Sequence, residues 1–209
     1  MPAYKLAIFD FDGTLGDTLG WMLDASDALA DRFGYLKLDR DKLDTLRTMS
    51  ARDLMKLQKL PALKLPMIAA HFQKLMTADA GRIEMFDGAP DMLRALHGAG
   101  VKLAIVSSNS EENIRLILGP ELCGLISMFS CGASMFGKAS KFRKVLKALG
   151  VKPGETISIG DEIRDIDAAR EVGLATGVVS WGYTKAAALK AQNPDRVFET
   201  IGEIVDQIG

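Results

Sequence analysis

The 209-residue sequence has few cysteines, no excess of charge of either sign and no long apolar run. Its two cysteines, Cys123 and Cys131, do not have the spacing of a metal site, and we expect a reduced pair. A net charge of −1 provides no basic field that would attract nucleic acid. The apolar runs are too short to span a bilayer, and the N-terminal residues lack the core of a signal peptide. These absences predict a cytoplasmic protein that binds neither nucleic acid nor membrane.

What the sequence does contain is a set of short apolar segments rich in branched residues. From the second segment onward, stretches of helical character separate one segment from the next. Short apolar strands that alternate with helices are typical of a parallel sheet whose two faces are covered. The sequence therefore predicts an α/β fold, a Rossmann-like parallel sheet with helices on both faces. The expected strands are 6–9, 102–106, 125–129, 156–159 and 176–179, and the expected helices are 90–96, 111–118, 140–149, 165–172 and 184–191.

The pattern changes between the first and the second expected strands. This region has no convincing strand pattern but several apolar stripes at helical spacing, such as the one from Trp21 to Phe33. Stripes of this kind usually form a packed core, and we expect the same here. The sequence therefore predicts a core domain made of residues 1–16 and 83–209 and an all-helical cap domain made of residues 17–82.

Polar residues follow three of the expected strands at the point where each strand ends. In an open parallel sheet, ligands bind beyond the carboxyl ends of the strands. These residues should therefore surround one site, together with a lysine, Lys138 or Lys141, that precedes the helix leading to the fourth strand. The first strand is followed by Asp10 and Asp12, the second by Ser107, Ser108 and Asn109, and the fourth by Asp161, Glu162 and Asp165.

Asp10 and Asp12 form the most informative pair. Residues two apart in an extended chain point to the same side, so both carboxylates can face one centre. An Asp-Gly turn would contain the same residues, but unneutralised carboxylates are costly to bury at the end of a core strand. A bound cation would offset that cost, and clustered carboxylates with water suit Mg²⁺. Because Asp161 could add a third carboxylate from a neighbouring strand, we expect a magnesium site at Asp10, Asp12 and Asp161.

A phosphoryl group needs positive charge and hydrogen-bond donors around its oxygens. Ser107 offers a hydroxyl and a backbone N–H, and Lys138 offers an ammonium group. A helix cap and a solvated lysine would explain these residues singly, but not their occurrence beside the carboxylates. The combination predicts a magnesium-dependent enzyme that acts on a small phosphorylated substrate.

Four segments resemble the motifs of the haloacid dehalogenase-like (HAD) hydrolases. Residues 10–15, with Asp-x-Asp-Gly-Thr-Leu, resemble the first motif, and the strand 103–107 that ends in serine resembles the second. The lysine of residues 136–138 resembles the third, and the Gly-Asp-x-x-x-Asp of residues 157–165 resembles the fourth. The resemblance runs from about residue 4 to the end and favours the members that are similar to phosphoglycolate phosphatases.

The resemblance implies roles for the carboxylates. Asp10 would be the nucleophile that forms an aspartyl-phosphate, and Asp12 would protonate the leaving group and then activate water. Mg²⁺ would be held by the Asp10 carboxylate, the backbone carbonyl of Asp12 and the Asp161 carboxylate. Asp165 would orient Lys138 or a metal-bound water. In this interpretation the enzyme is a phosphatase of small phosphorylated metabolites, such as phosphoglycolate or a sugar phosphate.

The resemblance also implies where the substrate binds. Ser107 and Lys138 would hold the phosphoryl group, with Ser108 and Asn109 beside them. The helical insertion resembles the C1-type cap of the family, which closes over the site and selects the substrate. Arg47 and Arg52 are the candidate cap residues for substrate contact.

Several other interpretations use the same residues. Residues 132–139 nearly match a P-loop, but Ala139 lacks the hydroxyl that would bind magnesium, so we reject a nucleoside triphosphatase. Asp12 argues against a dehalogenase, because a halide leaves without a proton. A phosphonate-cleaving enzyme would need a cap lysine that forms a Schiff base, and no single lysine is indicated. A phosphomutase with the same core and a non-catalytic regulatory module stay open as alternatives, as do a monomeric and a homodimeric state.

Overall fold

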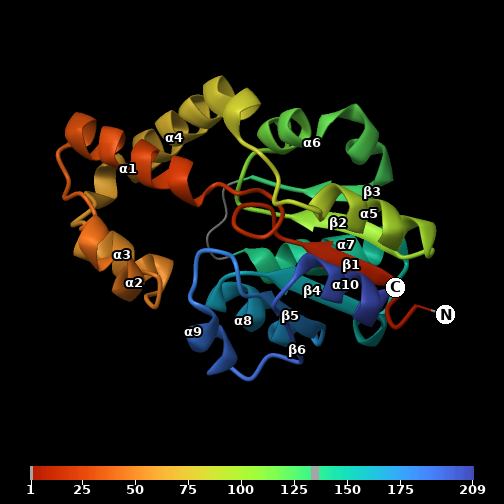
Figure 1. Cartoon of the computed structure of the whole chain (residues 1–209). Helices are drawn as coiled ribbons and strands as arrows, with labels where there is room; N and C mark the ends of the chain where they lie inside the picture. Colours follow the sequence, from red (N-terminus) through yellow and green to blue (C-terminus); the bar gives the residue numbers. More distant parts are fainter. Residues whose placement is uncertain (1, 133–136) are drawn as a thin grey trace.

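The computed structural model describes residues 2–132 and 137–209, and its centre is one parallel sheet. The strand order is β3-β2-β1-β4-β5-β6, and each neighbouring pair is parallel (Figure 1). The parallel α/β fold predicted from the sequence is therefore confirmed. The strands are β1 (Leu6–Phe9), β2 (Lys102–Val106), β3 (Ile126–Ser130), β4 (Thr156–Gly160), β5 (Ala175–Val179) and β6 (Arg196–Phe198).

Helices cover both faces of this sheet, as expected. Alternate residues of a strand point to opposite faces, so Ala7 and Phe9 of β1 pack on one side and Leu6 and Ile8 on the other. The first side is covered by α5 (Ala89–Gly98), α6 (Glu111–Leu125) and α10 (Ile201–Ile208). The second side is covered by α7 (Lys138–Leu149) and α8 (Ile163–Val172), and the short α9 (Ala186–Lys190) packs against α8 and β5.

The expected elements match the structure closely except at the edges of the sheet. β1 and β2 have the expected bounds, and β3 is displaced by one residue. The sixth strand was missed because three residues are too short a segment to give a pattern. Helix α6 continues beyond the expected end at residue 118, with a break at Gly119, whose φ is 71°.

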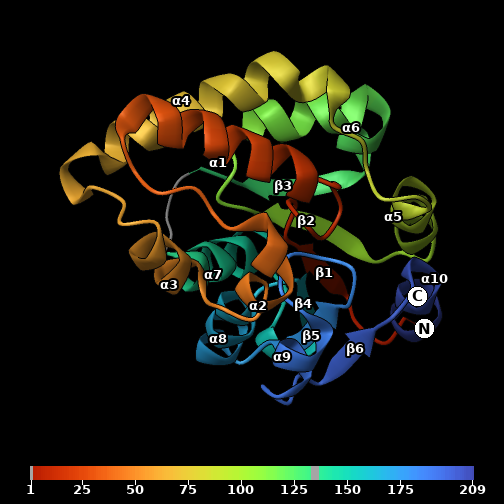
Figure 2. The ribbon, with the colours of Figure 1, turned by 60° about the vertical axis from the view of Figure 1, so that its left-hand side comes forward.

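Between β1 and α5 the chain is helical, in accordance with the sequence pattern. We call residues 17–82 the helical insertion. Its longest helices, α1 (Leu19–Phe33) and α4 (Leu65–Asp79), lie side by side (Figure 2). The ring centroids of Trp21 and Phe72 are 5.1 Å apart between them. The two shorter helices are α2 (Leu43–Leu46) and α3 (Ala51–Leu57). Single 3-10 turns occupy Arg40–Lys42, Ala62–Lys64, Ala80–Arg82 and, in the core, Pro153–Glu155.

Two adjacent segments connect the helical insertion to the sheet. The Asp17 N–H donates to the carbonyl of Glu84, and the Phe86 N–H donates to the carbonyl of Leu15, both at 2.9 Å. The helical insertion lies beyond the carboxyl end of β1 (Figure 1). The division into a core (residues 1–16 and 83–209) and a cap domain (17–82) stays a prediction, and we place its boundary at these paired segments.

Among the helices of the described residues, none is long and apolar enough to cross a membrane. The segment that resembles a P-loop contains residues 133–136, which lie outside the described residues, so its rejection rests on the sequence.

Candidate active site

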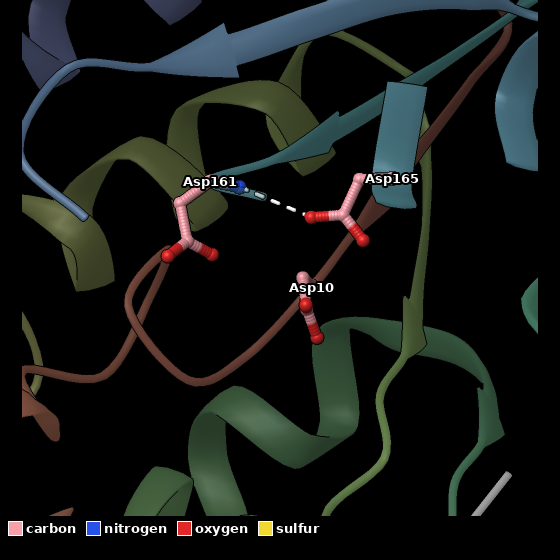
Figure 3. A group of neighbouring side chains, drawn as sticks. All are labelled: Asp10, Asp161 and Asp165. Atoms are coloured by element: carbon pink, nitrogen blue, oxygen red, sulfur yellow. Dashed lines mark hydrogen bonds between the residues drawn. The ribbon is translucent and has the colours of Figure 1, made fainter. Parts of the chain in front are cut away.

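Three carboxylates from two strand ends meet at the carboxyl edge of the sheet. Asp10 follows β1, Asp161 follows β4, and Asp165 lies in the first turn of α8. They are buried, with exposed fractions of 5%, 0% and 3%. One carboxylate oxygen from each lies within 4.8 Å of the others, and Figure 3 shows the three side chains close together. The expected convergence of separate strand ends is therefore present.

Asp10 is held at this centre by two donors. Its Oδ1 accepts the N–H of Phe11 at 2.8 Å, and its Oδ2 accepts Lys138 Nζ at 2.6 Å. Burial tends to raise the pKa of Asp10, but the charges of Lys138 and Arg164 outweigh burial and hold that pKa below its usual value. Asp10 is therefore an ionised, oriented carboxylate at the end of β1.

Lys138 and Asp165 are paired by a local feature of α8. The Asp165 Oδ2 accepts the N–H group of Asp161 at 3.2 Å (Figure 3) and that of Glu162 at 3.0 Å, which fixes its carboxylate at the start of the helix. The other oxygen of Asp165 accepts Lys138 Nζ. Burial opposes the charge of Lys138, but Asp10 and Asp165 outweigh it and raise the pKa of Lys138. The lysine thus stays cationic between two carboxylates.

Glycine makes this close arrangement possible at two positions. A Cβ on Gly160, the last residue of β4, would overlap the carboxylate of Asp165. A Cβ on Gly13 would overlap Asp161 and would lie 2.8 Å from the ring of Tyr183, and Gly13 also has a φ of 74°. Both glycines belong to the motifs quoted from the sequence, and the structure gives their physical reason.

Asp161 is a buried carboxylate of the cluster that accepts hydrogen bonds from donors without charge. Its Oδ1 accepts the hydroxyl of Thr14 at 3.0 Å, and its Oδ2 accepts the N–H of Tyr183 at 2.7 Å, so both donors are neutral. Burial, followed by the charges of Glu162 and Asp10, raises the pKa of Asp161 well above its usual value. Three hard oxygen ligands in one space, one of them with neutral partners, fit a divalent cation that prefers oxygen.

Asp12 points to another part of the site. Its Oδ1 accepts Asn109 Nδ2 at 3.2 Å, and its side chain lines a cavity shared with the helical insertion. Burial and the charge of Asp10 raise the pKa of Asp12 to about 7. The Asp12 side chain is not one of the three clustered carboxylates, so the expectation that Asp12 contributes its backbone carbonyl to a metal stays a prediction.

The loop after β2 carries the other expected residues. Ser107 is buried, and its Oγ accepts the N–H of Asn109 at 3.1 Å. Lys141 Nζ donates to the carbonyls of Ser107, at 2.8 Å, and Gly132, at 2.7 Å, and so ties this loop to α7. Of the two candidate lysines, Lys138 is the one that contacts the Asp10 carboxylate. Lys138 is also the first residue of α7, not part of the preceding loop as the sequence suggested.

Two cavities lie beside the site, although Asp10, Asp161 and Asp165 line neither of them. The first, of about 320 Å³, is lined by Ser107 and Lys138, and we call it the strand-end cavity. The second, of about 460 Å³, is lined by Asp12 and mainly by apolar side chains of α1, α3 and α4, and we call it the insertion cavity. Ser108 and Arg164 line both cavities, so the two spaces are neighbours. A ligand that spans them would contact both the sheet and the helical insertion.

Arg47 has a different environment from the one we expected. Its Nε donates to the carbonyl of Tyr183 at 3.0 Å, and its Nη2 donates to the carbonyl of Gly182 at 2.6 Å. Arg47 therefore joins the end of α2 to the loop after β5, although its side chain also lines the insertion cavity. Its role in substrate binding stays a prediction. Arg52, the other candidate, lines the strand-end cavity.

Sequence reasoning missed the contribution of the loop after β5. Tyr183 donates its N–H to Asp161, and its hydroxyl is hydrogen-bonded to Thr18 of the segment that leads to α1. The rule that identified Asp10 and Asp161, namely polar residues after an apolar strand, would have indicated this loop if applied to the fifth strand. Thr14 and Arg164 stand inside the quoted motifs but received no role.

Comparisons with known proteins agree with this geometry. A family model described as haloacid dehalogenase-like hydrolase matches residues 7–179. A phosphoglycolate phosphatase of Synechococcus elongatus is 31% identical over 202 residues, which cover 96% of this chain and 95% of that protein. A phosphoglycolate phosphatase of Xylella fastidiosa is 31% identical over 193 residues, covering 86% and 81%. Among solved structures, a haloacid dehalogenase-like hydrolase of Streptococcus pneumoniae has a TM-score of 0.82 at 19% identity and covers 98% of both chains.

Proposed function

Because the chain belongs to the haloacid dehalogenase-like hydrolases, we propose that Asp10 is the nucleophile of a phosphatase active site at the carboxyl edge of the sheet. The protein is a hydrolase of phosphate monoesters, and its substrates are small phosphorylated metabolites. The observation that carries the assignment of roles is the meeting of Asp10, Asp161 and Asp165 with Lys138.

In the proposed reaction, an Asp10 carboxylate oxygen attacks phosphorus as the bond from phosphorus to the leaving oxygen breaks. Asp12 gives its proton to that leaving oxygen. A water then loses a proton to Asp12 and attacks the phosphorus of the aspartyl-phosphate, which releases phosphate and restores Asp10. The position of Asp12 supports this role, because Asp12 lines the insertion cavity, where the leaving group would lie.

Lys138 and Ser107 would bind the phosphoryl oxygens. Lys138 already contacts Asp10. Lys138 and Ser107 both line the strand-end cavity. Asp165 would act through Lys138, whose ammonium it holds against Asp10. Ser108 lines both cavities and Asn109 holds Asp12, which supports their assignment to the substrate side of the site.

We propose that the cation of this site is Mg²⁺. The carboxylates of Asp10 and Asp161 and the backbone carbonyl of Asp12 would hold it. When bound, the cation supplies positive charge that offsets the charge of the phosphoryl group and the carboxylates. The buried oxygen ligands support a hard divalent cation of this kind.

Phosphoglycolate is the substrate that we propose, since two relatives that cover most of the chain are phosphoglycolate phosphatases. The test is a set of phosphorylated metabolites with Mg²⁺: phosphoglycolate, several sugar phosphates and nucleoside monophosphates. We expect the release of inorganic phosphate to be fastest from phosphoglycolate. Faster release from a sugar phosphate would contradict the substrate, and no release from any compound would contradict the proposed site.

A further inference from the structure

Arg164 occupies the junction of the two cavities. It lies in the first turn of α8, between the carboxylates of Asp161 and Asp165 in sequence, and its side chain lines both the strand-end cavity and the insertion cavity. A substrate whose phosphoryl group lies beside Lys138 in the strand-end cavity and whose leaving group lies beside Asp12 in the insertion cavity would pass Arg164. Arg164 therefore stands where the phosphoryl side of the site meets the leaving-group side.

The hydrogen bonds of Arg164 are incomplete in a way that points to a ligand. Its Nη2 donates to Glu162 Oε1 at 2.5 Å, and this pair orients the guanidinium. Its Nε is buried, and among the described residues it is the one buried side-chain nitrogen or oxygen without a hydrogen-bond partner. A guanidinium has five N–H donors, and a buried donor without a partner is costly. An acceptor from a bound molecule would remove that cost.

Arg47, the other cationic residue that lines the insertion cavity, already has hydrogen-bond partners. Arg47 gives its Nε and Nη2 to the backbone carbonyls of Tyr183 and Gly182. Arg164 is thus better placed to offer N–H groups to an acidic ligand. Much of the remaining lining comes from side chains such as Leu23, Leu46 and Phe72, which offer no hydrogen bonds to the hydroxyl groups of a sugar.

We propose that Arg164 binds a carboxylate on the leaving group of the substrate and thereby selects small phosphorylated acids over phosphorylated sugars and alcohols. The inference rests on the proposed function and assigns the acidic part of the substrate to one residue. A carboxylate matches the fork of a guanidinium, which can donate two parallel hydrogen bonds. The transferred phosphoryl group has separate partners, because Lys138 contacts Asp10 itself.

The test compares two esters that differ in the carboxylate. The kcat/KM for phosphoglycolate and for ethyl phosphate is measured with Mg²⁺ for the wild type, Arg164→Met and Arg164→Lys. For Arg164→Met we expect the ratio of kcat/KM for phosphoglycolate to kcat/KM for ethyl phosphate to fall about 10- to 100-fold, the range for a hydrogen bond to a charged group. An effect of the lost Arg164 charge on Asp10 acts on both esters and leaves this ratio unchanged. Arg164→Lys, which keeps the charge but not the fork, should lie between. Arg143→Met, on the exposed side of α7, is the matched control and should leave both values unchanged.

Equal losses on both esters would overturn the proposal, because Arg164 would then serve the phosphoryl group or the fold. No loss on either ester would overturn it too. Calorimetric binding of both esters to the Asp10→Asn protein, with and without Arg164→Met, separates this inference from the proposed function because it needs no turnover. Weaker binding of phosphoglycolate alone supports the role of Arg164 even if the wild type hydrolyses neither ester, and equal binding contradicts it.

Discussion

At the scale of single residues, the site depends on short contacts between side chains and backbone N–H groups. Asp165 accepts the N–H groups of Asp161 and Glu162 and holds Lys138, which in turn contacts Asp10. Because each group positions the next, the orientation of Lys138 depends on the residue that lets Asp165 approach β4. That residue is Gly160, whose missing Cβ leaves room for the carboxylate.

Gly160→Ala should therefore damage the site more than the fold. The added Cβ overlaps the Asp165 carboxylate, so we expect Asp165 to move and Lys138 to lose its alignment with Asp10. Phosphatase activity should fall by at least tenfold, and the free energy of unfolding, from urea denaturation, should fall by about 1–3 kcal/mol. Gly154→Ala is the control, since its Cβ would meet no atom within 4 Å. Full activity in Gly160→Ala would refute this role.

Much of the site could be predicted from the sequence at this scale, and the reason is physical. Asp10, Ser107 and Asp161 each follow an apolar strand directly, so their positions depend on local sequence and on the parallel sheet. Arg164 and Tyr183 were not assigned. The same rule, applied to the fifth strand, would have indicated the loop of Tyr183, but the contact of its hydroxyl with Thr18 depends on long-range packing that sequence spacing does not contain. The contact of Arg164 with Glu162 is local, whereas its position in both cavities depends on how α8 lies against the helical insertion.

At the scale of elements, the helical insertion is fastened to the core by α2. Arg47 donates to the carbonyls of Gly182 and Tyr183, the Lys185 N–H donates to the Arg47 carbonyl at 2.9 Å, and Lys185 forms an ion pair with Asp44 at 2.9 Å. These contacts hold the insertion against the loop that also binds Asp161. If residues 17–82 form the predicted cap domain, these contacts would hold it against the core.

Arg47→Met should loosen this fastening. Two hydrogen bonds from a charged donor are lost, so we expect docking to weaken by about 1–3 kcal/mol, and hydrogen–deuterium exchange in α2 and α3 to become faster. The KM for the substrate should rise more than kcat falls, because the insertion lines both cavities. Arg82→Met, which removes an exposed i,i+3 ion pair of the same insertion, should leave exchange in α2 unchanged. Unchanged exchange in Arg47→Met would contradict the fastening role.

Asp195 lies just before β6 and binds Thr176 near the start of β5. This contact should make the stability of the fold depend on pH. The Asp195 Oδ2 accepts the N–H of Thr176 at 2.8 Å and the hydroxyl of Thr176 at 2.7 Å. These bonds hold the pKa of Asp195 below its usual 3.8 in the folded state. A lowered folded pKa contributes stability that is present above about pH 4 and is lost as the pH falls through the folded pKa.

Asp195→Asn should therefore be less stable than the wild type by about 1 kcal/mol at pH 7, a small value because the residue is exposed. The difference, measured by urea denaturation, should shrink as the pH is lowered toward 3. Asp206→Asn, an exposed change in α10, serves as the control. A difference that stays constant from pH 7 to pH 3 would show that the Asp195 charge does not stabilise this edge of the sheet.

Only part of the sheet could be predicted from the sequence at this scale. Apolar runs identify five strands. β1 and β4 are buried throughout, β2 and β5 are buried except at their first residues, and the edge strand β3 is partly exposed but carries no charge. The edge strand β6 is three residues long, and its first residue, Arg196, is exposed, so it has no such pattern. The pairing of residues 84–86 with the segment after β1 is a long-range contact that the local sequence does not encode.

At the scale of the whole molecule, cation binding should stabilise the fold. The acidic cluster joins β1, β4 and α8, so a cation that binds it favours the folded state. At a concentration of 100 times its Kd, Mg²⁺ should raise Tm by roughly 5–10 °C, and EDTA should reverse this and abolish phosphatase activity. Asp161→Asn should lose most of the Mg²⁺-dependent rise in Tm. Activity that is indifferent to EDTA and to added Mg²⁺ would contradict the proposed metal site.

The central claim, that Asp10 is the nucleophile of a phosphatase, is tested most directly by the turnover of phosphoglycolate and of a generic aryl phosphate with Mg²⁺ in the wild type and in Asp10→Asn. The account predicts phosphate release by the wild type and a loss of about a thousandfold or more in kcat for Asp10→Asn, with an unchanged circular dichroism spectrum. Turnover by Asp10→Asn at a rate near that of the wild type would contradict it.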